Sequence, residues 1–308
     1  MFDLSIIIIG YNTQKELFNL LTSINSQNLD KKKQIECIYV DDGSTDFSID
    51  CFNKFDLLFH KKCISLKKNL GRVYATQKGI DAATGNWFLF IRSNLVFEKN
   101  SINEFFNSIK SVKADVFMGS VKYTSNDLVF GRYLNHSSRG TNTYQHNHKI
   151  HYRHLLFGNS VFKSKLFKKY RLNENLKFYG GEELDLAEKI YINNKSIICF
   201  CKRASAVRQN HPSFSAHVER LKEFGENNLH YLSKNNQKLV LSYCFYLKKI
   251  KLLIGFWAVS LFFIKKTYKY NVFSLNYFLI RWGLLSAIMI GSCKSKAVQS
   301  FPNSSHLK

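Results

Sequence analysis

Two clusters of acidic side chains lie beside segments that predict regular secondary structure, where a loop can present them to a ligand. Asp41-Asp42-Gly43-Ser44 directly follows the apolar run Ile35–Val40, and Glu182-Glu183 follows Gly180-Gly181 at the start of a helical pattern. A carboxylate at a strand end can accept a hydrogen bond from a ring N–H or a ribose hydroxyl. A carboxylate in the first turn of a helix is stabilised as the anion and can take a proton from a hydroxyl. Each cluster also has a plainer explanation, because Asp-Gly-Ser is common in turns and acidic residues balance the helix dipole.

The N-terminal part of the chain alternates between apolar strand patterns and helical patterns. This alternation predicts an α/β sheet with helices on both faces. Ligands bind such sheets beyond the carboxyl ends of the strands, so we expect the site in the loops after Ile9, Val40 and Ile91. The predicted strands are Leu4–Ile9, Ile35–Val40, Cys63–Leu66 and Trp87–Ile91, and the predicted helices are Asn12–Ser26, a weak one from Thr45, and Gly71–Ala83.

The middle of the chain is less regular. Residues 115–175 give no clear periodicity, and residues 132–154 are rich in His, Asn, Arg and Tyr, which indicates a mobile loop. The histidines fit no recognised metal spacing, so we expect a solvated loop that becomes ordered over a substrate; they are His136, His146, His148, His151 and His154. Further along, the patterns predict a helix over Glu182–Ile192, a strand over Ser196–Cys201 and a helix over Val218–Leu232.

Five motifs near the N-terminus occur in an order that is typical of one enzyme family. They are Tyr11-Asn12, Asp41–Ser44, Asn69-Leu70-Gly71, Ala83-Thr84-Gly85 and the strand Trp87–Ile91. Together they resemble the family 2 glycosyltransferases, inverting nucleotide-sugar enzymes of the GT-A fold, and the resemblance covers about residues 3–230. It implies an α/β domain over residues 1–232, with the Rossmann-like mixed sheet of nucleotide-diphospho-sugar transferases flanked by helices.

The resemblance also implies a set of residues that contact the donor nucleotide. Tyr11 would lie against a uracil-type ring, Asp42 would bind the base, and Asp41 or Ser44 would support the loop. Arg72 would contact a phosphate, with a solvated surface arginine as the alternative. The full implied set is Ile9, Gly10, Tyr11, Asn12, Asp41, Asp42, Ser44, Arg72 and Gln77.

The chain departs from the family after its fourth strand. Family members usually have Asp-x-Asp there, which holds Mg²⁺ or Mn²⁺ against the diphosphate, whereas this chain has Arg92-Ser93-Asn94. A hard divalent cation normally needs at least one carboxylate, so the resemblance makes a Mg or Mn cofactor doubtful here. His211, in RQNHPSF, stands where many relatives carry a histidine that binds metal or diphosphate. A histidine in a surface loop is the alternative.

Three explanations of this departure remain open. Arg92 could replace the metal by neutralising the leaving diphosphate directly, as arginine does at other phosphate sites. A metal could bind weakly through Asn94, His211 and the diphosphate itself. The domain could instead have lost its activity. In both active cases the charge that develops on the leaving nucleotide diphosphate has to be stabilised.

A second segment, FYGGEELDLAEKI at residues 178–190, resembles the acceptor site of the family. Family members have Gly-Gly-Glu-Asp there, and its second acid is the catalytic base. The resemblance therefore implies Glu183 as the base that deprotonates an acceptor hydroxyl. Gly181, Glu182 and Asp185 would bind the sugar or the acceptor, and Asn159, in FGNSVFKSKLF, would lie near the donor sugar.

The positive charge of the chain is unevenly distributed. The net charge is +23, and residues 227–308 hold 12 Lys+Arg and no Asp or Glu, which indicates an anionic partner. Two apolar stretches there, Leu252–Ile264 and Phe273–Ile290, are shorter than the about 20 residues that a spanning helix needs. We expect residues 233–308 to form a basic, aromatic helical region on a membrane surface, with ordinary core packing as the alternative. No recognised nucleic-acid motif is present.

Composition and motifs together indicate the class of protein. A chain that is 45% hydrophobic can bury a core, and seven irregularly spaced cysteines with no signal-peptide pattern indicate reduced thiols and a cytoplasmic, membrane-peripheral location. We expect an inverting, hexosyltransferase-type glycosyltransferase. It would move a sugar from a nucleoside diphosphate, expected to be UDP, to a hydroxyl of a glycan or lipid-linked acceptor in cell-surface polysaccharide or glycolipid synthesis. The alternative is a catalytically degenerate nucleotide-sugar-binding partner of an active glycosyltransferase.

Overall fold

The computed structural model describes residues 2–30, 32–270 and 273–295, and the chain packs into two compact units. The first unit is Met1–Lys177 with Glu182–His211, and the second is Phe178–Gly181 with Pro212–Lys308. The predicted domain boundary after residue 232 lies further along the chain than this division. Residues 214–231 belong to the second unit because they pack on its last helix. Residues 296–308 of the predicted C-terminal region lie outside the described residues.

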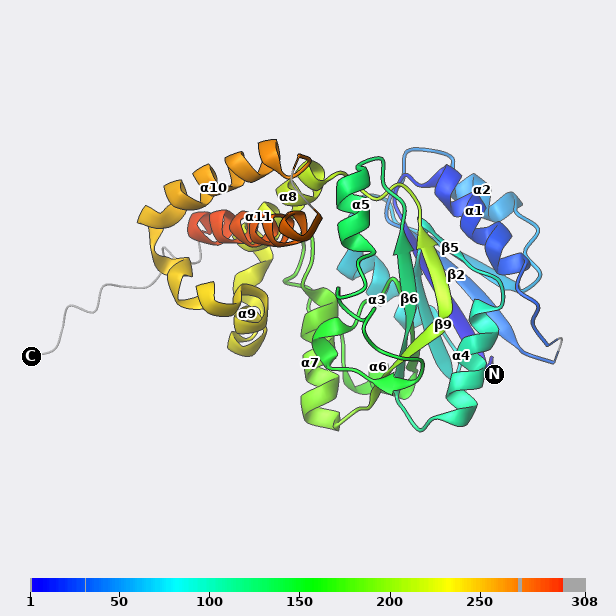
Figure 1. Cartoon of the computed structure of the whole chain (residues 1–308). Helices are drawn as coiled ribbons and strands as arrows, with labels where there is room; N and C mark the ends of the chain where they lie inside the picture. The colour runs from blue at the N-terminus through cyan, green and yellow to red at the C-terminus, as the bar shows by residue number, and fades with distance from the viewer. Residues whose placement is uncertain (1, 31, 271–272, 296–308) are drawn as a thin grey trace, which may run out of the picture. The chain divides into compact units, whose positions relative to one another are not determined.

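A nine-stranded mixed sheet forms the described core of the first unit (Figure 1). Its order is β3-β2-β1-β4-β8-β6-β9-β5, and β7 pairs with β9. Strands β1 to β4 are parallel to one another, whereas β8 runs antiparallel to β4. The strands are β1 Leu4–Gly10, β2 Ile35–Asp41, β3 His60–Ser65, β4 Trp87–Arg92, β5 Leu95–Phe97, β6 Val116–Tyr123, β7 His148–Lys149, β8 Asn159–Lys163 and β9 Ile198–Arg208.

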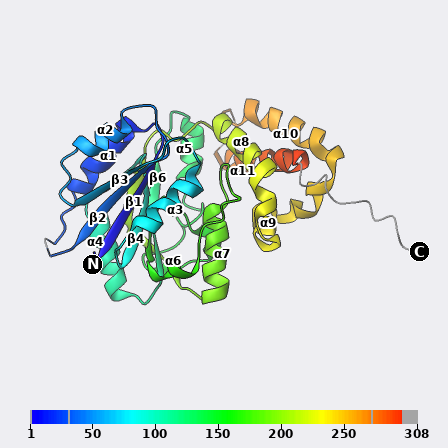
Figure 2. The ribbon, with the colours of Figure 1, turned by 180° about the vertical axis from the view of Figure 1, so that it is seen from behind.

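The central strand β1 is apolar throughout because helices cover both of its faces. Ile6 and Ile8 belong to the core that Leu20 and Leu21 of α1 complete. On the other face, α3 lies against β1 and β2 (Figure 2), and Gly79 lets it approach Ile7 closely. The helices of this unit are α1 Gln14–Asn25, α2 Ser48–Lys54, α3 Arg72–Ala82, α4 Ser101–Ser111, α5 Leu128–Leu134, α6 Lys165–Lys169 and α7 Glu182–Asn194.

The segment over residues 115–175 contains more regular structure than its pattern predicts. It forms β6, α5, β7, β8 and α6, together with a 3-10 turn over Tyr152–His154. The predicted strand Ser196–Cys201 also continues further, as β9, to Arg208. The pairing of β9 with β6 shifts its register between Gly119 and Ser120 of β6. This irregularity interrupts the alternation of buried and exposed side chains by which a strand is predicted from sequence. Cys199 and Cys201 are both fully buried in β9.

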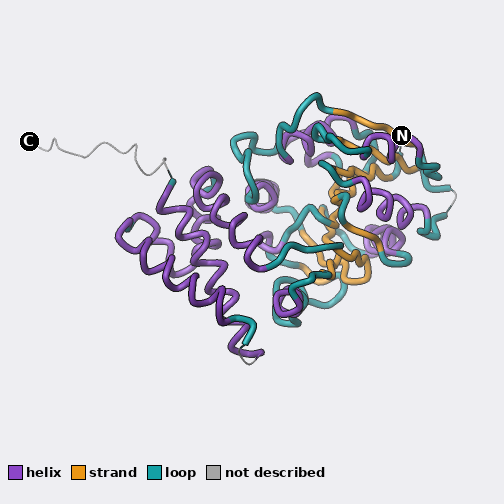
Figure 3. The backbone as a smooth tube through the Cα atoms, turned by 90° about the horizontal axis from the view of Figure 1, so that it is seen from above, coloured by secondary structure: helices purple, strands orange, loops and turns teal. Residues whose placement is uncertain are grey.

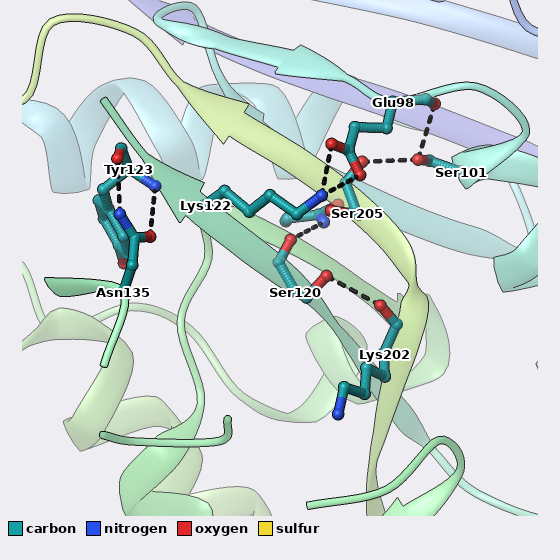
Figure 4. A network of polar contacts seen from close by, with 9 residues as sticks. Glu98, Ser101, Ser120, Lys122, Tyr123, Asn135, Lys202 and Ser205 are labelled. Carbon is teal, nitrogen blue, oxygen red and sulfur yellow. Dashed lines mark hydrogen bonds and ion pairs between the residues drawn. The ribbon is translucent and has the colours of Figure 1, made fainter. Parts of the chain in front are cut away.

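Polar contacts reinforce the sheet around this irregularity (Figure 4). The Lys122 ammonium lies 2.7 and 2.9 Å from the two carboxylate oxygens of Glu98, just beyond β5. The Ser101 hydroxyl donates to the carbonyl of Ser205, and the Ser120 hydroxyl donates to the carbonyl of Lys202. The Ser120 contact joins β6 to β9 where their backbone register changes, and the other two tie these strands to the segment after β5.

The second unit is helical over its described residues (Figure 3). Helix α11 packs on α10 and on α8, and Gly225 and Gly291 remove the side chains that would collide with backbone at the closest approach of α11 to residues 222–225. The Trp282 indole also donates to the Ser260 hydroxyl at 2.8 Å. The elements are α8 Phe214–Glu223, a π-helical turn Phe224–Asn228, 3-10 turns Leu229–Tyr231, Ser242–Lys249 and Lys251–Leu253, α9 Lys234–Leu241, α10 Ile254–Thr267 and α11 Phe273–Lys294.

Helix α11 is longer than the apolar stretch that predicts it. The stretch ends at Ile290, but the helix continues to Lys294, and its part Leu275–Lys294 is long and apolar enough to cross a membrane by length and composition. In this structure 56% of its apolar window is buried within the protein. The sequence pattern predicts that both apolar stretches are too short to span a membrane. For α11 this prediction is wrong, because the helix reaches spanning length.

Candidate active site

The carboxyl ends of β1, β2 and β4 meet at one edge of the sheet. Gly10 pairs with Asp41, and Ile9 pairs with Arg92. The Asp42 N–H then donates to the Gly10 carbonyl at 2.9 Å, and the Ser93 N–H donates to the Ile9 carbonyl at 3.3 Å. The register thus brings together three of the sequence-predicted segments, which are far apart in the chain.

Side chains join the loop after β1 to the loop after β2. Asn12 adopts a positive φ of 51°, and its N–H donates to the Ser44 hydroxyl at 2.8 Å. Its side-chain oxygen accepts from the Thr45 N–H, while the Asp41 carboxylate accepts from the Ser44 N–H and the Tyr39 hydroxyl. These residues build the wall of the site, beside which the Tyr11 side chain is 45% exposed.

Asp42 is buried and holds the turn that begins α3. Its two carboxylate oxygens accept from the N–H groups of Leu70 and Gly71 at 2.8 and 3.1 Å. Gly71 can close this turn because it adopts a φ of 92°, which glycine tolerates best. Burial raises the pKa of Asp42 above its ordinary value, and the two N–H groups oppose that rise.

Gln77, which the resemblance places at the donor nucleotide, has its side chain engaged within the protein. Its side chain is buried in α3, where its amide donates to Asp81 and its oxygen accepts from the Leu172 N–H. Both ends of the amide are therefore engaged within the protein.

Two arginine–glutamate pairs lie at the start of α7. Arg72, the first residue of α3, pairs with Glu182, whose side chain is only 2% exposed. Arg92, the last residue of β4, pairs with Glu183 at 2.5 Å, with side-chain exposures of 25% and 12%. Burial raises the pKa of Glu182, and the Arg72 guanidinium opposes this rise. The four side chains form a charge-balanced cluster of predicted phosphate-binding and acceptor-binding residues.

The backbone turns sharply before this cluster. Gly180 and Gly181 both have positive φ, at 86° and 97°, and the helix begins directly after them at Glu182. Asp185, one turn further, pairs with Lys189 at 2.6 Å. The predicted acceptor-binding carboxylate of Asp185 therefore has a partner on its own helix.

The remaining predicted residues lie around the same end of the sheet or are packed inside it. Asn159 pairs with Ile91 in the sheet, and its amide donates to the carbonyls of Ser120 and Ala204. His211 is buried, with its ring against Tyr123 and Phe130 at 5.3 and 5.5 Å between ring centroids.

The residues at the end of β4 do not fit a divalent cation. Within the described part of the chain, no group of three or more His, Cys, Asp or Glu side chains could hold a metal ion. Asn94 offers a buried side-chain oxygen without a hydrogen-bond partner, but the neighbouring Arg92 guanidinium occupies the Glu183 carboxylate. Mg²⁺ and Mn²⁺ prefer several oxygen ligands, including carboxylates.

The two ion pairs are the features that motif analysis alone missed. The motifs place Arg72 and Arg92 on one side of the site and Glu182 and Glu183 on the other, but no motif joins them. A signal was present, because an arginine at a position where relatives have an acid needs a new counter-charge nearby. The adjacent glutamates at residues 182–183 are that counter-charge.

Comparison with known proteins identifies the family. The model of "Glycosyl transferase family 2" matches residues 5–171. This chain belongs to glycosyl transferase family 2. Glycosyltransferase GlyA of Streptococcus pneumoniae serotype 4 is 24% identical over 224 residues, which cover 69% of this chain and 31% of GlyA. The match thus spans about a third of the length of that relative.

Solved structures agree on the fold. The structure of S. aureus TarS 1-349 superposes with a TM-score of 0.57 and 17% identity, covering 97% of this chain and 92% of that one. Another structure of TarS 1-349 is a complex with UDP-GlcNAc, at a TM-score of 0.56 and 16% identity, covering 96% and 92% of the two chains. This family 2 chain therefore has the GT-A fold, as predicted.

Replacing Arg72 should destabilise the protein, because the buried Glu182 carboxylate loses its partner. Arg72→Gln should lower the free energy of unfolding by about 3 kcal/mol, the lower end for a buried pair because Arg72 is itself partly exposed, since removing one partner leaves a buried carboxylate unpaired. The raised pKa of Glu182 means that its ionised form costs stability once the pH rises through that pKa. The loss in Arg72→Gln should therefore shrink as the pH falls, measured by urea unfolding at several pH values.

Two controls accompany this measurement. Arg171→Gln removes a similar but exposed pair with Asp81 and should cost less than about 1 kcal/mol. The double variant Arg72→Gln/Glu182→Gln should recover most of the loss. A loss that is equal in both single variants, and independent of pH, would contradict the interpretation.

Proposed function

We propose that this family 2 chain is an inverting glycosyltransferase of the hexosyltransferase type with a UDP-linked donor. The acceptor is a hydroxyl of a glycan or a lipid-linked molecule in cell-surface polysaccharide or glycolipid synthesis. The observation that carries the proposal is the Arg92–Glu183 pair at the carboxyl end of β4. It joins a cation suited to a diphosphate with a carboxylate suited to a hydroxyl proton. The UDP and UDP-GlcNAc complexes of TarS 1-349 support the choice of donor.

The geometry supports a direct displacement. The loops after β1 and β2 hold the nucleotide, with Tyr11 beside the base and Asp42 fixing the turn before α3. Glu183 accepts the proton of the acceptor hydroxyl, and the oxygen attacks the anomeric carbon as the bond to the diphosphate breaks. The leaving nucleotide diphosphate carries the electron pair away, and Arg92 stabilises its negative charge without a metal.

One observation favours a second candidate function. The Glu183 oxygen is already bonded to Arg92 at 2.5 Å, and a carboxylate with a fixed partner is less available to a substrate. A degenerate domain that binds a nucleotide sugar and assists an active glycosyltransferase would carry the same pair. Binding of UDP-sugar without transfer or release of sugar distinguishes this candidate from the enzyme.

The second unit supplies a surface suited to a membrane. On α10, Phe256, Val259 and Phe263 are more than half exposed and lie on one face at helical spacing. The last turn of the helix contains Lys265 and Lys266, within the acid-free residues 227–308, and Lys265 also pairs with Glu219 of α8 at 2.9 Å. Apolar side chains flanked by lysines suit a helix that lies in the plane of an anionic interface. We propose a cytoplasmic enzyme held at the inner face of the membrane through this helix, near a lipid-linked acceptor.

The role of Glu183 can be tested by a near-isosteric change. Glu183→Gln should lower the transfer rate by about 10²–10⁴-fold, because the amide cannot take the proton, while UDP binding is retained. Transfer is measured as the UDP released with a range of glycan acceptors. Glu174→Gln, an exposed carboxylate in the same unit, is the matched control and should keep full activity. Full activity in Glu183→Gln would exclude it as the base.

The role of Arg92 leads to a prediction about metals. Transfer should persist in excess EDTA, whereas Arg92→Gln should lower it by about 10²–10³-fold because one stabilising charge is lost. The same assay is run in EDTA, in Mg²⁺ and in Mn²⁺. Complete loss in EDTA that Mn²⁺ restores would show that the diphosphate depends on a metal and not on Arg92.

Membrane binding can be measured on vesicles. The protein should sediment with phosphatidylglycerol vesicles and less with phosphatidylcholine vesicles, since the basic surface needs an anionic lipid. Phe256→Ser/Phe263→Ser should weaken vesicle binding by about tenfold or more, because two aromatic side chains that would be buried in the lipid interface are lost. Phe47→Ser, which alters an exposed phenylalanine of the first unit, is the control. Equal binding by all three proteins would contradict the role of α10.

A further inference from the structure

Arg92 has two competing anionic partners in the proposed reaction. Its guanidinium is bonded to the Glu183 carboxylate at 2.5 Å, and the same group is required at the donor diphosphate. A guanidinium binds a carboxylate or a phosphate through the same fork of N–H donors. The base and the leaving group therefore compete for one cation, and full contact with the diphosphate weakens the contact with Glu183.

We propose that the Arg92–Glu183 pair is a latch that the donor opens, an inference that rests on the proposed function. Without a donor, Arg92 holds an oxygen of the base. A bound nucleoside diphosphate draws the guanidinium away and leaves that oxygen for the acceptor hydroxyl. The base becomes available only when a leaving group is in place, so the donor binds productively before the acceptor.

The neighbouring pair shows why this contact opens and the other stays closed. Glu182 is 2% exposed, and separating it from Arg72 would leave a buried charge without its guanidinium partner. Arg92 and Glu183 are more open to solvent, with exposures of 25% and 12%, so water can compensate for their separation. Gly158 lies beside the Arg92 side chain. Because glycine has no side chain, it leaves room on that side for the guanidinium to move.

The latch also accounts for the reset of the site. During transfer the hydroxyl proton passes to Glu183, the new bond forms between the acceptor oxygen and the anomeric carbon, and the old bond releases the nucleotide diphosphate. When this product leaves, Arg92 loses its anionic partner. Once the proton has passed from Glu183 to water, the guanidinium returns to the carboxylate. Arg92 is the positioning residue for the base as well as the group that contacts the diphosphate.

The test measures UDP binding and does not depend on turnover. If Glu183 competes with UDP for Arg92, Glu183→Gln should bind UDP about 5- to 20-fold more tightly than the unmodified chain. Affinity is measured by calorimetry on the full chain, in EDTA and at low salt, with thermal unfolding as a check on folding. Glu174→Gln, the exposed carboxylate used above, should leave UDP affinity unchanged.

A double-variant cycle identifies the cation. In an Arg92→Gln background, the further change Glu183→Gln should give no gain in UDP affinity, because the competed group is gone. An equal gain in both backgrounds overturns the latch, since it would reflect general repulsion between Glu183 and UDP. Equal UDP affinity in the unmodified chain and in Glu183→Gln also overturns the latch, while leaving the proposed transfer intact.

The remaining outcomes separate the latch from the proposed function. Failure of every form to bind UDP overturns both, because the donor class itself would be wrong. A gain in UDP affinity in Glu183→Gln that needs Arg92, together with full transfer activity, supports the competition but removes Glu183 as the base. A gain that needs Arg92, together with loss of transfer, supports both.

Discussion

The parallel register of β1 with β2 and β4 determines everything else at the site. It pairs Gly10 with Asp41 and Ile9 with Arg92, so three distant segments end at one edge. The register is pinned by Ser5 of β1, whose hydroxyl donates to the buried Glu36 carboxylate directly opposite on β2 at 2.6 Å, a contact that a slip by one residue would break. This pairing inside the sheet thus positions a guanidinium that lies two strands away from Asp41.

Charge balance is the second constraint on the site. A family 2 site with two acids after β4 can use a cation to hold a diphosphate, but this chain has an arginine there. An arginine among other cations would be unfavourable, and the structure compensates for it with Glu183, as it compensates for Arg72 with Glu182. The cluster is neutral before a ligand binds. In the proposed function, a diphosphate that enters would compete with one of the glutamates for a guanidinium, and the more exposed pair is the one that can yield.

The sequence predicts β1, β2 and β4 well because their apolar runs are continuous and are followed by turn residues. It places β3 too late, because β3 begins with His60, Lys61 and Lys62, which are exposed, and an exposed edge strand has no apolar pattern to detect. Residues 115–175 fail for a related reason: their elements are short, and their order depends on pairing with β4 and β9, which lie far away in the chain.

At the site, motifs identify segments, whereas their contacts depend on tertiary structure. Resemblance to the family brings in Asp42, Arg72 and Glu183 by position, and all three lie in the first unit. It could not show that Gln77 is engaged by the Leu172 N–H, which reaches it only through the fold, whereas its contact with Asp81 lies one turn further along the same helix.

The net charge of +23 has two separate physical meanings in this structure. In the first unit, the arginines that matter are paired with glutamates and act locally at short range. In the second unit, Lys265 pairs with Glu219 of α8, and the remaining positive charge of residues 227–308, which contain no acid, adds up to a field that reaches about a Debye length. Helix α11 is 56% buried over its apolar window. Its neighbour α10 carries the exposed apolar face formed by Phe256, Val259 and Phe263. A long-range positive field beside an apolar face attracts an anionic interface without requiring a span, whereas the paired arginines select a ligand by its geometry. In the proposed function, the charge of the second unit would therefore serve location and that of the first unit chemistry.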